Sequence, residues 1–242
     1  MNLRPYVPNT ITLLNLFSGC IALHFAFQQN YLFAFYFVAL GIFLDFFDGF
    51  FARMFQVSGP LGVQLDSLAD MVTSGTVPGV VMFLMMSNSS GSDGEGWVGL
   101  FPYLGFIITL ASCYRLAKFN IDTRQTNSFI GLPTPANALF IISLPLVLQQ
   151  SDSLLVLGLL TDRWLLLGIT LLSAYLLNAE IPLFSLKIKK FSFRENSLQI
   201  IFLLMSVVLL IAFRYSGVPI VILLYVLLSV ITNKLRRADA KA

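Results

Sequence analysis

The sequence has few charged side chains. Of its 242 residues, 15 are Lys or Arg and 12 are Asp or Glu, which together make 11 % of the chain. A soluble domain of this size carries about a quarter of its residues as charged side chains, or roughly 60. The shortage excludes a water-soluble globule. The apolar share of 57 % and the mean hydropathy of +0.83 instead indicate a chain whose outer surface faces lipid.

Nitrogen and sulfur ligands for metals are also scarce. His24 is the only histidine, and Cys20 and Cys113 lie far apart in apolar surroundings. We therefore do not expect a zinc site, and we expect both cysteines to be small buried side chains. The net charge of +3 is too small to indicate a nucleic acid partner.

Long apolar runs are what the sequence has in abundance. A helix needs about 20 apolar residues to cross a bilayer, and runs of about that length lie at 9–27, 31–53, 67–87, 97–118, 135–150, 164–186, 197–213 and 218–234. The sequence therefore predicts an all-α, polytopic transmembrane helix bundle of about eight spans, with a range of six to eight because the fifth run is short. No room remains for a soluble domain, so residues 1–242 are expected to form one integral membrane domain.

The basic residues predict an orientation, because Lys and Arg in short loops stay on the cytoplasmic side. If the N-terminus is cytoplasmic, 13 of the 15 basic residues fall on that side, and only Arg163 and Arg214 fall on the other. We therefore expect both termini in the cytoplasm. Nothing resembles a cleaved signal or a transit peptide, which favours the plasma membrane of a bacterium or archaeon.

Four aspartates interrupt this apolar background. Asp45 and Asp48 stand near the end of the second run, and Asp66 and Asp70 at the start of the third. Each Asp at the centre of a spanning helix costs about 2.5–3.5 kcal/mol. The two pairs are spaced by three and by four residues, so each pair shares one helix face. The connection between the runs is short, and we expect the four carboxylates to converge near one membrane surface.

A cation must compensate this cluster, and Arg53 alone cannot. Hard divalent ions prefer all-oxygen ligands, so the pattern predicts a site for Mg²⁺, Mn²⁺ or Ca²⁺. Gly49, Ala52 and Gly62 lie on the same faces. Small residues there allow a bulky polar ligand to approach the backbone, although they also serve close helix packing.

The whole pattern reads Asp45-x-x-Asp48-Gly49-x-x-Ala52-Arg53, eight residues, then Gly62-x-x-x-Asp66-x-x-x-Asp70. It resembles the signature of the CDP-alcohol phosphotransferases at all eight defined positions. Within that family, the stretches 8–15, 115–120, 131–137 and 181–187 are similar to those of the membrane-spanning phosphatidylserine synthases.

The resemblance implies transfer of a phosphatidyl group from CDP-diacylglycerol to the hydroxyl of L-serine, with release of CMP, by a homodimer whose active site faces the cytoplasm. It implies that Asp45, Asp48, Asp66 and Asp70 hold two divalent cations, Mg²⁺ or Mn²⁺, and that Asp70 is also the general base. The residues implied to contact the CDP-diacylglycerol are Asn9, Thr12, Gly49, Ala52, Arg53, Ser58 and Gly62.

The acceptor side is less defined by the sequence. Arg115 and Lys118 are candidates for binding a carboxylate or phosphate of the acceptor, but they are also explained as anchors that reach the lipid headgroups. Glu180 is a candidate for the serine ammonium group. Glycerol 3-phosphate or inositol phosphate are the alternative acceptors. A cation transporter is a further alternative, but it predicts acids spread at mid-membrane depth and an internal repeat, and the sequence has neither.

Overall fold

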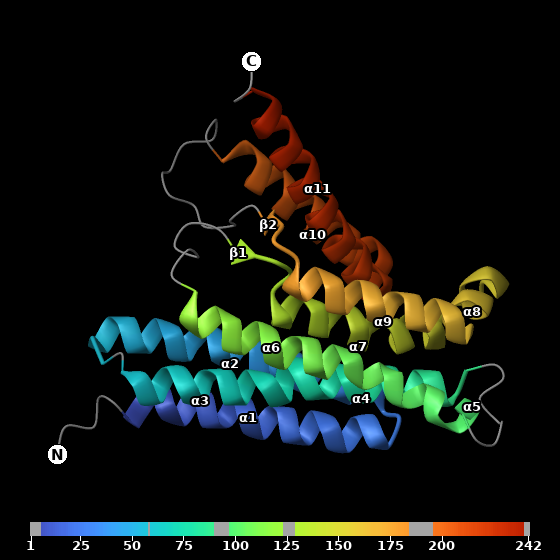
Figure 1. Ribbon diagram of the computed structural model, residues 1–242, viewed down its shortest axis with the longest axis horizontal. Coiled ribbons are helices and arrows are strands. Elements are labelled where there is room, and N and C mark those ends of the chain that lie inside the picture. Colours follow the sequence, from blue (N-terminus) through green and yellow to red (C-terminus); the bar gives the residue numbers. More distant parts are fainter. Residues whose placement is uncertain (1–5, 58, 90–96, 123–128, 184–195, 240–242) are drawn as a thin grey trace.

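The computed structural model describes residues 6–57, 59–89, 97–122, 129–183 and 196–239 (Figure 1). Almost all of these residues are helical, which confirms the expected all-α class. The elements are α1 (Tyr6–Phe27), α2 (Tyr31–Phe55), α3 (Pro60–Asp70), η1 (Met71–Thr76), α4 (Val77–Ser87), α5 (Trp97–Leu100), η2 (Phe101–Phe106), α6 (Ile107–Ile121), β1 (Phe129–Ile130), α7 (Thr134–Gln150), α8 (Leu154–Leu160), α9 (Arg163–Asn178), β2 (Pro182–Leu183), α10 (Ser197–Phe213), η3 (Arg214–Ser216) and α11 (Gly217–Asp239).

The ends of α2 show how the sequence sets its length. Asn30 precedes the helix, and its side-chain oxygen accepts a hydrogen bond from the backbone N–H of Phe33 at 3.4 Å. At the other end, Gln56 takes the left-handed conformation, with φ 54°, and its N–H bonds to the carbonyls of Ala52 and Arg53. Pro60 then occupies the first turn of α3, where its missing N–H costs nothing. These signals reverse the chain between the two aspartate pairs.

Helices α3 and α4 form one continuous helix, Pro60–Ser87, that contains a π-helical segment. This segment, η1, begins immediately after Asp70 and carries Thr73 and Ser74, which are both fully buried. π-Helical turns inside α-helices are rare and occur frequently at functional sites. The π-helical segment therefore marks the end of α3, at Asp70, as a candidate functional position.

Helix α1 packs along α2 and also contacts α3, η1 and α4, so it links the two aspartate-bearing helices. Helices α4 and α7 complete this bundle, and α6 packs against η1 and α9 (Figure 1). Helices α10 and α11 pack on each other as a hairpin that leans away from the bundle (Figure 1). The hairpin contacts the bundle chiefly where α11 packs against α7. A two-stranded antiparallel pairing, Phe129 with Leu183 and Ile130 with Pro182, lies beside the hairpin and is the only strand pairing among the described residues.

The core between these helices is built from small and medium apolar side chains, which lets transmembrane helices approach closely. Its fully buried members include Ala22, Ala26, Ala34, Val38, Val77, Val81, Met82, Met86, Ile108, Ile141, Ile142 and Leu166. The outer surface is also apolar: α10 alone exposes Ile201, Leu203, Leu204, Val208 and Ile211. Such a surface is stable only in lipid, and the chain is an integral membrane protein. Cys20 and Cys113 lie on this surface, so the expectation that they are buried is wrong.

The helices of the described residues do not confirm the expected eight spans. By length and composition, four helical segments of the described chain can cross a membrane, and the bent pair α8 and α9 makes a fifth if it is counted as one span. The four segments are Tyr6–Phe27, Tyr31–Phe55, Pro60–Ser87 and Leu198–Lys234. The last of these contains both α10 and α11, which fold back on each other at η3 (Figure 1).

Breaks within the apolar runs explain why fewer than eight uninterrupted helices are long enough to qualify. The run 97–118 is divided among α5, the 3₁₀ segment η2 and α6, with Pro102 inside η2. Helices α7 and α9 have 17 and 16 residues, fewer than the about 20 that a straight crossing needs. Apolar composition alone did not reveal these breaks. The cytoplasmic placement of the termini stays a prediction.

Candidate active site

Three of the four aspartates meet where α2 and α3 come together. Carboxylate oxygens of Asp45, Asp48 and Asp66 all lie within 4.8 Å of one another, and Asp45 and Asp66 are in hydrogen-bond contact. Asp48 is buried, and the other two are half-buried. Negative charges this close repel each other strongly where water is scarce. A cation among them removes this repulsion, and a donor set made only of oxygen suits Mg²⁺ or Mn²⁺.

Asp70 lies one helical turn beyond Asp66 and outside the group of three. It is 9 % exposed, and its charge acts on Asp45, Asp48 and Asp66, so it borders the cluster. The side-chain amide of Asn15 donates a hydrogen bond to Asp70 Oδ1 at 3.3 Å. The Arg115 guanidinium also attracts the Asp70 carboxylate electrostatically. Asp70 therefore accepts one hydrogen bond, from Asn15, and lies in the electrostatic field of Arg115.

A buried hydrogen-bond chain sets the orientation of Asn15. Thr73, in η1, donates from its hydroxyl to Asn15 Oδ1 at 2.9 Å. Because Oδ1 accepts from Thr73, the amide nitrogen of Asn15 must point the other way, toward Asp70. Asn15 and Thr73 are both fully buried. A Cβ at Gly41 would lie 2.7 Å from Asn15 Oδ1, so α2 leaves room for this amide.

A cavity of about 150 Å³ opens beside the cluster between α1, α2 and α3. Thr12 lines it and donates a hydrogen bond to Asp48 Oδ2 at 2.5 Å. The complete lining is Pro8, Asn9, Thr12, Asp48, Gly49, Ala52, Val57, Gly59, Gly62, Val63 and Asp66. Five of the seven residues expected to contact CDP-diacylglycerol therefore line one cavity: Asn9, Thr12, Gly49, Ala52 and Gly62.

The two remaining residues of that set are outside the lining. Arg53 is exposed, and its guanidinium lies beside Gly49 at the edge of the cavity, with Nη1 3.6 Å from the position that a Cβ there would take. Ser58 lies outside the described residues, although its neighbours Val57 and Gly59 line the cavity. The cavity thus has carboxylates at one side and a guanidinium at its edge.

Packing between helices does not explain the glycines of this cavity. A Cβ on Gly49 would approach only Arg53, at 3.6 Å, and a Cβ on Gly62 would approach only Asn9 Oδ1, also at 3.6 Å. Both distances are ordinary van der Waals contacts. The protein could therefore accommodate Ala at either position, and the missing side chains leave space in the cavity itself.

Arg115 and Lys118 differ in their surroundings. Arg115 is 8 % exposed, and its Nε has no hydrogen-bond partner among the described residues. The hydroxyls of Ser74 and Ser112, on η1 and α6, are likewise buried without a described partner. Buried polar atoms of this kind are usually satisfied by a bound group or water. Lys118 is partly exposed, and its Nζ lies 3.7 Å from Oε1 of Glu180. Lys118 and Glu180, both candidates for binding the acceptor, therefore form a salt bridge with each other.

Comparison with known proteins agrees with this geometry. The model of the CDP-alcohol phosphatidyltransferase family matches residues 5–175, which include the four signature aspartates and the lining of the cavity beside them.

The chain belongs to the CDP-alcohol phosphatidyltransferase family.

Several curated relatives are named CDP-diacylglycerol–serine O-phosphatidyltransferase. The protein of Bacillus subtilis (strain 168) is 34 % identical over 134 residues, which are 54 % of this chain and 70 % of the relative. That of Helicobacter pylori (strain J99) is 32 % identical over 56 % of this chain and 55 % of the relative. That of Mycobacterium leprae (strain TN) is 29 % identical over 73 % and 57 %. The chain thus matches between about half and 70 % of the length of these family members.

Asn15 and Thr73 were not among the candidate residues derived from the sequence, although both contribute to the environment of Asp70. Each is a polar residue within an apolar run, and a buried polar side chain in a membrane helix needs a partner. That signal was present. The partner could not be found without the structure, because 58 residues separate Asn15 from Thr73.

Proposed function

We propose that the chain is a CDP-diacylglycerol–serine O-phosphatidyltransferase, which transfers the phosphatidyl group from CDP-diacylglycerol to the hydroxyl of L-serine and releases CMP. The observation that carries the proposal is the cluster of Asp45, Asp48 and Asp66 at the wall of a cavity lined by the family's signature residues. Relatives named for this activity support serine as the acceptor.

In this proposal, the four aspartates hold two divalent cations, Mg²⁺ or Mn²⁺. When bound, these ions supply charge neutralisation of the diphosphate and stabilise the attacking and departing oxygens. The cytidine diphosphate is bound by the seven residues expected from the sequence: Asn9, Thr12, Gly49, Ala52, Arg53, Ser58 and Gly62. The apolar outer faces of the same helices leave the acyl chains in lipid.

Asp70 is the proposed general base. It accepts the proton of the serine hydroxyl as the serine oxygen attacks the phosphorus. The amide of Asn15 orients this carboxylate, and Thr73 orients the amide, so the reactive oxygen is held in one direction before substrate arrives. Arg115 is proposed to bind the serine carboxylate, because a guanidinium matches a planar carboxylate with two donors. We assign Lys118, paired with Glu180, to the rim of this acceptor site.

Two features of the wider assembly follow from the same proposal. The active site faces the cytoplasm, from which water-soluble serine arrives and into which CMP is released, and the enzyme resides in a bacterial or archaeal plasma membrane. The family resemblance further implies a homodimer.

An acceptor panel tests the proposed reaction. Purified protein in detergent with CDP-diacylglycerol and Mn²⁺ receives serine, glycerol 3-phosphate or inositol phosphate in turn, and CMP release is measured. We expect release only with serine. Release only with glycerol 3-phosphate or inositol phosphate would reject the serine assignment but keep the family chemistry. No release with any acceptor would reopen transport as the function.

A further inference from the structure

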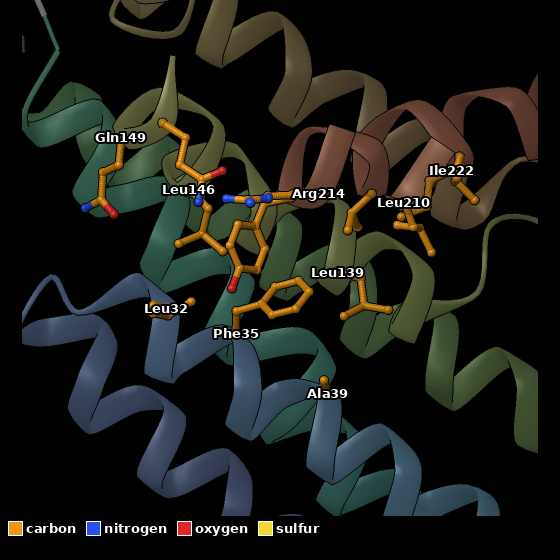
Figure 2. Close-up of a pocket in the computed structure, with 13 residues that line it drawn as sticks. Leu32, Phe35, Ala39, Leu139, Leu146, Gln149, Leu210, Arg214 and Ile222 are labelled. Carbon is orange, nitrogen blue, oxygen red and sulfur yellow. The ribbon is translucent and has the colours of Figure 1, made fainter. Parts of the chain in front are cut away.

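A cavity of about 850 Å³ (Figure 2) shares no lining residue with the cavity beside the aspartates. It is a groove bounded by the first half of α2, by α7, and by the end of α10, η3 and the start of α11. Its residues on α2 are Leu32, Phe35 and Ala39. Phe35 precedes Asp48 by 13 residues, which corresponds to about 20 Å along a helix. The groove and the aspartate cluster therefore lie toward opposite ends of the same helix.

The lining of the groove is apolar along most of its length and polar at one part only. The apolar part is Leu32, Phe35, Ala39, Leu139, Leu146, Leu210, Val218, Val221 and Ile222. The polar groups are Gln149 and Gln150, at the end of α7, with Arg214 and Tyr215 in η3. No acidic residue is among the described residues that line it. The groove is thus amphipathic and carries a single positive charge.

Arg214 is built into the groove by the turn that carries it. Its backbone is in a left-handed region, with φ 49° and ψ −122°, a conformation that is costly for a residue with a side chain. The adjacent Tyr215 hydroxyl forms a 2.8 Å hydrogen bond with the Tyr36 hydroxyl on α2, which ties the turn to the bundle. Figure 2 shows the Arg214 side chain extending across the groove toward Leu146. Within the described chain, Arg214 makes no salt bridge with a carboxylate.

We propose that this groove binds an anionic phospholipid, with an acyl chain along its apolar wall and the headgroup phosphate on Arg214. A guanidinium at a membrane surface binds a phosphate oxygen with charge-assisted hydrogen bonds. The Gln149 and Gln150 amides add donors for the ester or headgroup oxygens. A net negative headgroup is favoured because it neutralises Arg214, whereas a zwitterionic headgroup also brings its own cation to the site.

This lipid is distinct from the proposed donor substrate. The diphosphate of CDP-diacylglycerol must reach the aspartates, whereas a phosphate on Arg214 lies near the other end of α2. The groove is therefore a second lipid site, on the membrane side opposite the aspartate cluster, and its occupation does not depend on the proposed catalysis.

Native mass spectrometry of the delipidated full chain in detergent tests the inference. Phosphatidylglycerol and phosphatidylcholine of identical acyl chains are added separately. We expect phosphatidylglycerol to be retained about tenfold more than phosphatidylcholine, the effect of one charge-assisted contact. Arg214→Gln removes this preference. Arg163→Gln is the matched control, because Arg163 is the other base expected on that side and lies over the Phe101 and Trp164 rings instead.

Two further variants locate the lipid. Ala39→Phe fills the apolar part of the groove and lowers retention of phosphatidylglycerol, whereas Asp48→Asn, at the aspartate cluster, leaves retention unchanged. Equal retention of the two lipids by the unmodified chain would overturn the inference. So would unchanged retention in Arg214→Gln, equal losses in Arg214→Gln and Arg163→Gln, or loss of retention in Asp48→Asn, which would place the lipid at the donor site. Because binding is measured without turnover, failure of the proposed reaction would leave this test valid.

Discussion

At the scale of single residues, the candidate site depends on carboxylates whose surroundings differ. Asp45, Asp48 and Asp66 face one another within 4.8 Å, an arrangement suited to a cation. Asp70 stands apart from them and accepts a hydrogen bond from Asn15. The spacing of the four residues in the sequence does not show this difference. It arises because Asp70 is one turn deeper along α3, where α1 supplies a donor.

Substitution of Asp70 separates chemistry from donor binding. Asp70→Asn keeps the size of the side chain but cannot accept a proton from serine. We expect turnover to fall by about 10²-fold or more, while binding of CDP-diacylglycerol remains measurable by equilibrium dialysis. An equal loss of binding and turnover would contradict the role of Asp70 as base and would assign it to metal or donor binding alone.

The chain from Thr73 through Asn15 to Asp70 predicts a graded effect. Thr73→Val keeps the shape but removes the donor to Asn15 Oδ1, so the amide no longer has a fixed orientation. We expect kcat to fall about tenfold with little change in KM for CDP-diacylglycerol, and we expect Thr73→Ser to restore most of the activity.

Thr170→Val is the matched control for this series. Thr170 is also fully buried in an apolar helix, and among the described residues its hydroxyl bonds only to the carbonyl of Leu166 in its own helix. It should leave kcat unchanged. If Thr170→Val and Thr73→Val reduce kcat equally, the effect at Thr73 is general destabilisation rather than orientation of Asp70.

At the scale of helices, the sequence predicted where helices lie along the chain better than where each helix is interrupted. The runs 9–27 and 31–53 correctly predicted the end of α1 at Phe27 and the start of α2 at Tyr31, which Asn30 caps. The run 97–118 was predicted as one span, yet it is divided by η2. Hydropathy does not predict such a break, because the residues around Pro102 are as apolar as those of a continuous helix. Hydropathy also did not predict the π-helical segment after Asp70, because such a segment changes the backbone hydrogen bonding without changing the composition.

The glycines of α2 and α3 allow a test of the cavity. Gly49→Leu adds a side chain that the helix tolerates but that projects into the cavity beside Arg53. We expect KM for CDP-diacylglycerol to rise about tenfold, measured by CMP release at saturating serine. Gly168→Leu is the control, because Gly168 in α9 has no neighbouring atom within 4 Å of its missing Cβ. An unchanged KM in Gly49→Leu would show that the donor binds elsewhere.

At the scale of the whole molecule, composition correctly indicated an integral membrane helix bundle, whereas the predicted number of eight spans is not confirmed. The charge shortage was informative because it made the few remaining charges easy to interpret. Helix partners could not be predicted in the same way. Which apolar faces pack together depends on the fit of side chains such as Ala34, Val81 and Ile141, and lipid and protein surroundings favour the same residue types.

Removal of metal should affect activity and not the fold. The helices are stabilised by apolar packing far beyond the aspartates, so a chelator is expected to abolish CMP release while helical circular dichroism stays unchanged. Addition of Mg²⁺ or Mn²⁺ in excess of the chelator should restore turnover. Full activity in the chelator would contradict the assignment of the aspartates to divalent cations.

The central claim is that the serine hydroxyl attacks the phosphatidyl phosphorus at this site. Mass spectrometry of the lipid formed from CDP-diacylglycerol and serine labelled with heavy oxygen in its hydroxyl group tests it most directly. The account predicts phosphatidylserine that retains the heavy oxygen, together with unlabelled CMP, and about 10²-fold or more slower formation of this lipid by Asp70→Asn. Absence of labelled phosphatidylserine from the unmodified enzyme, with a lipid product formed only from glycerol 3-phosphate or inositol phosphate, would contradict it.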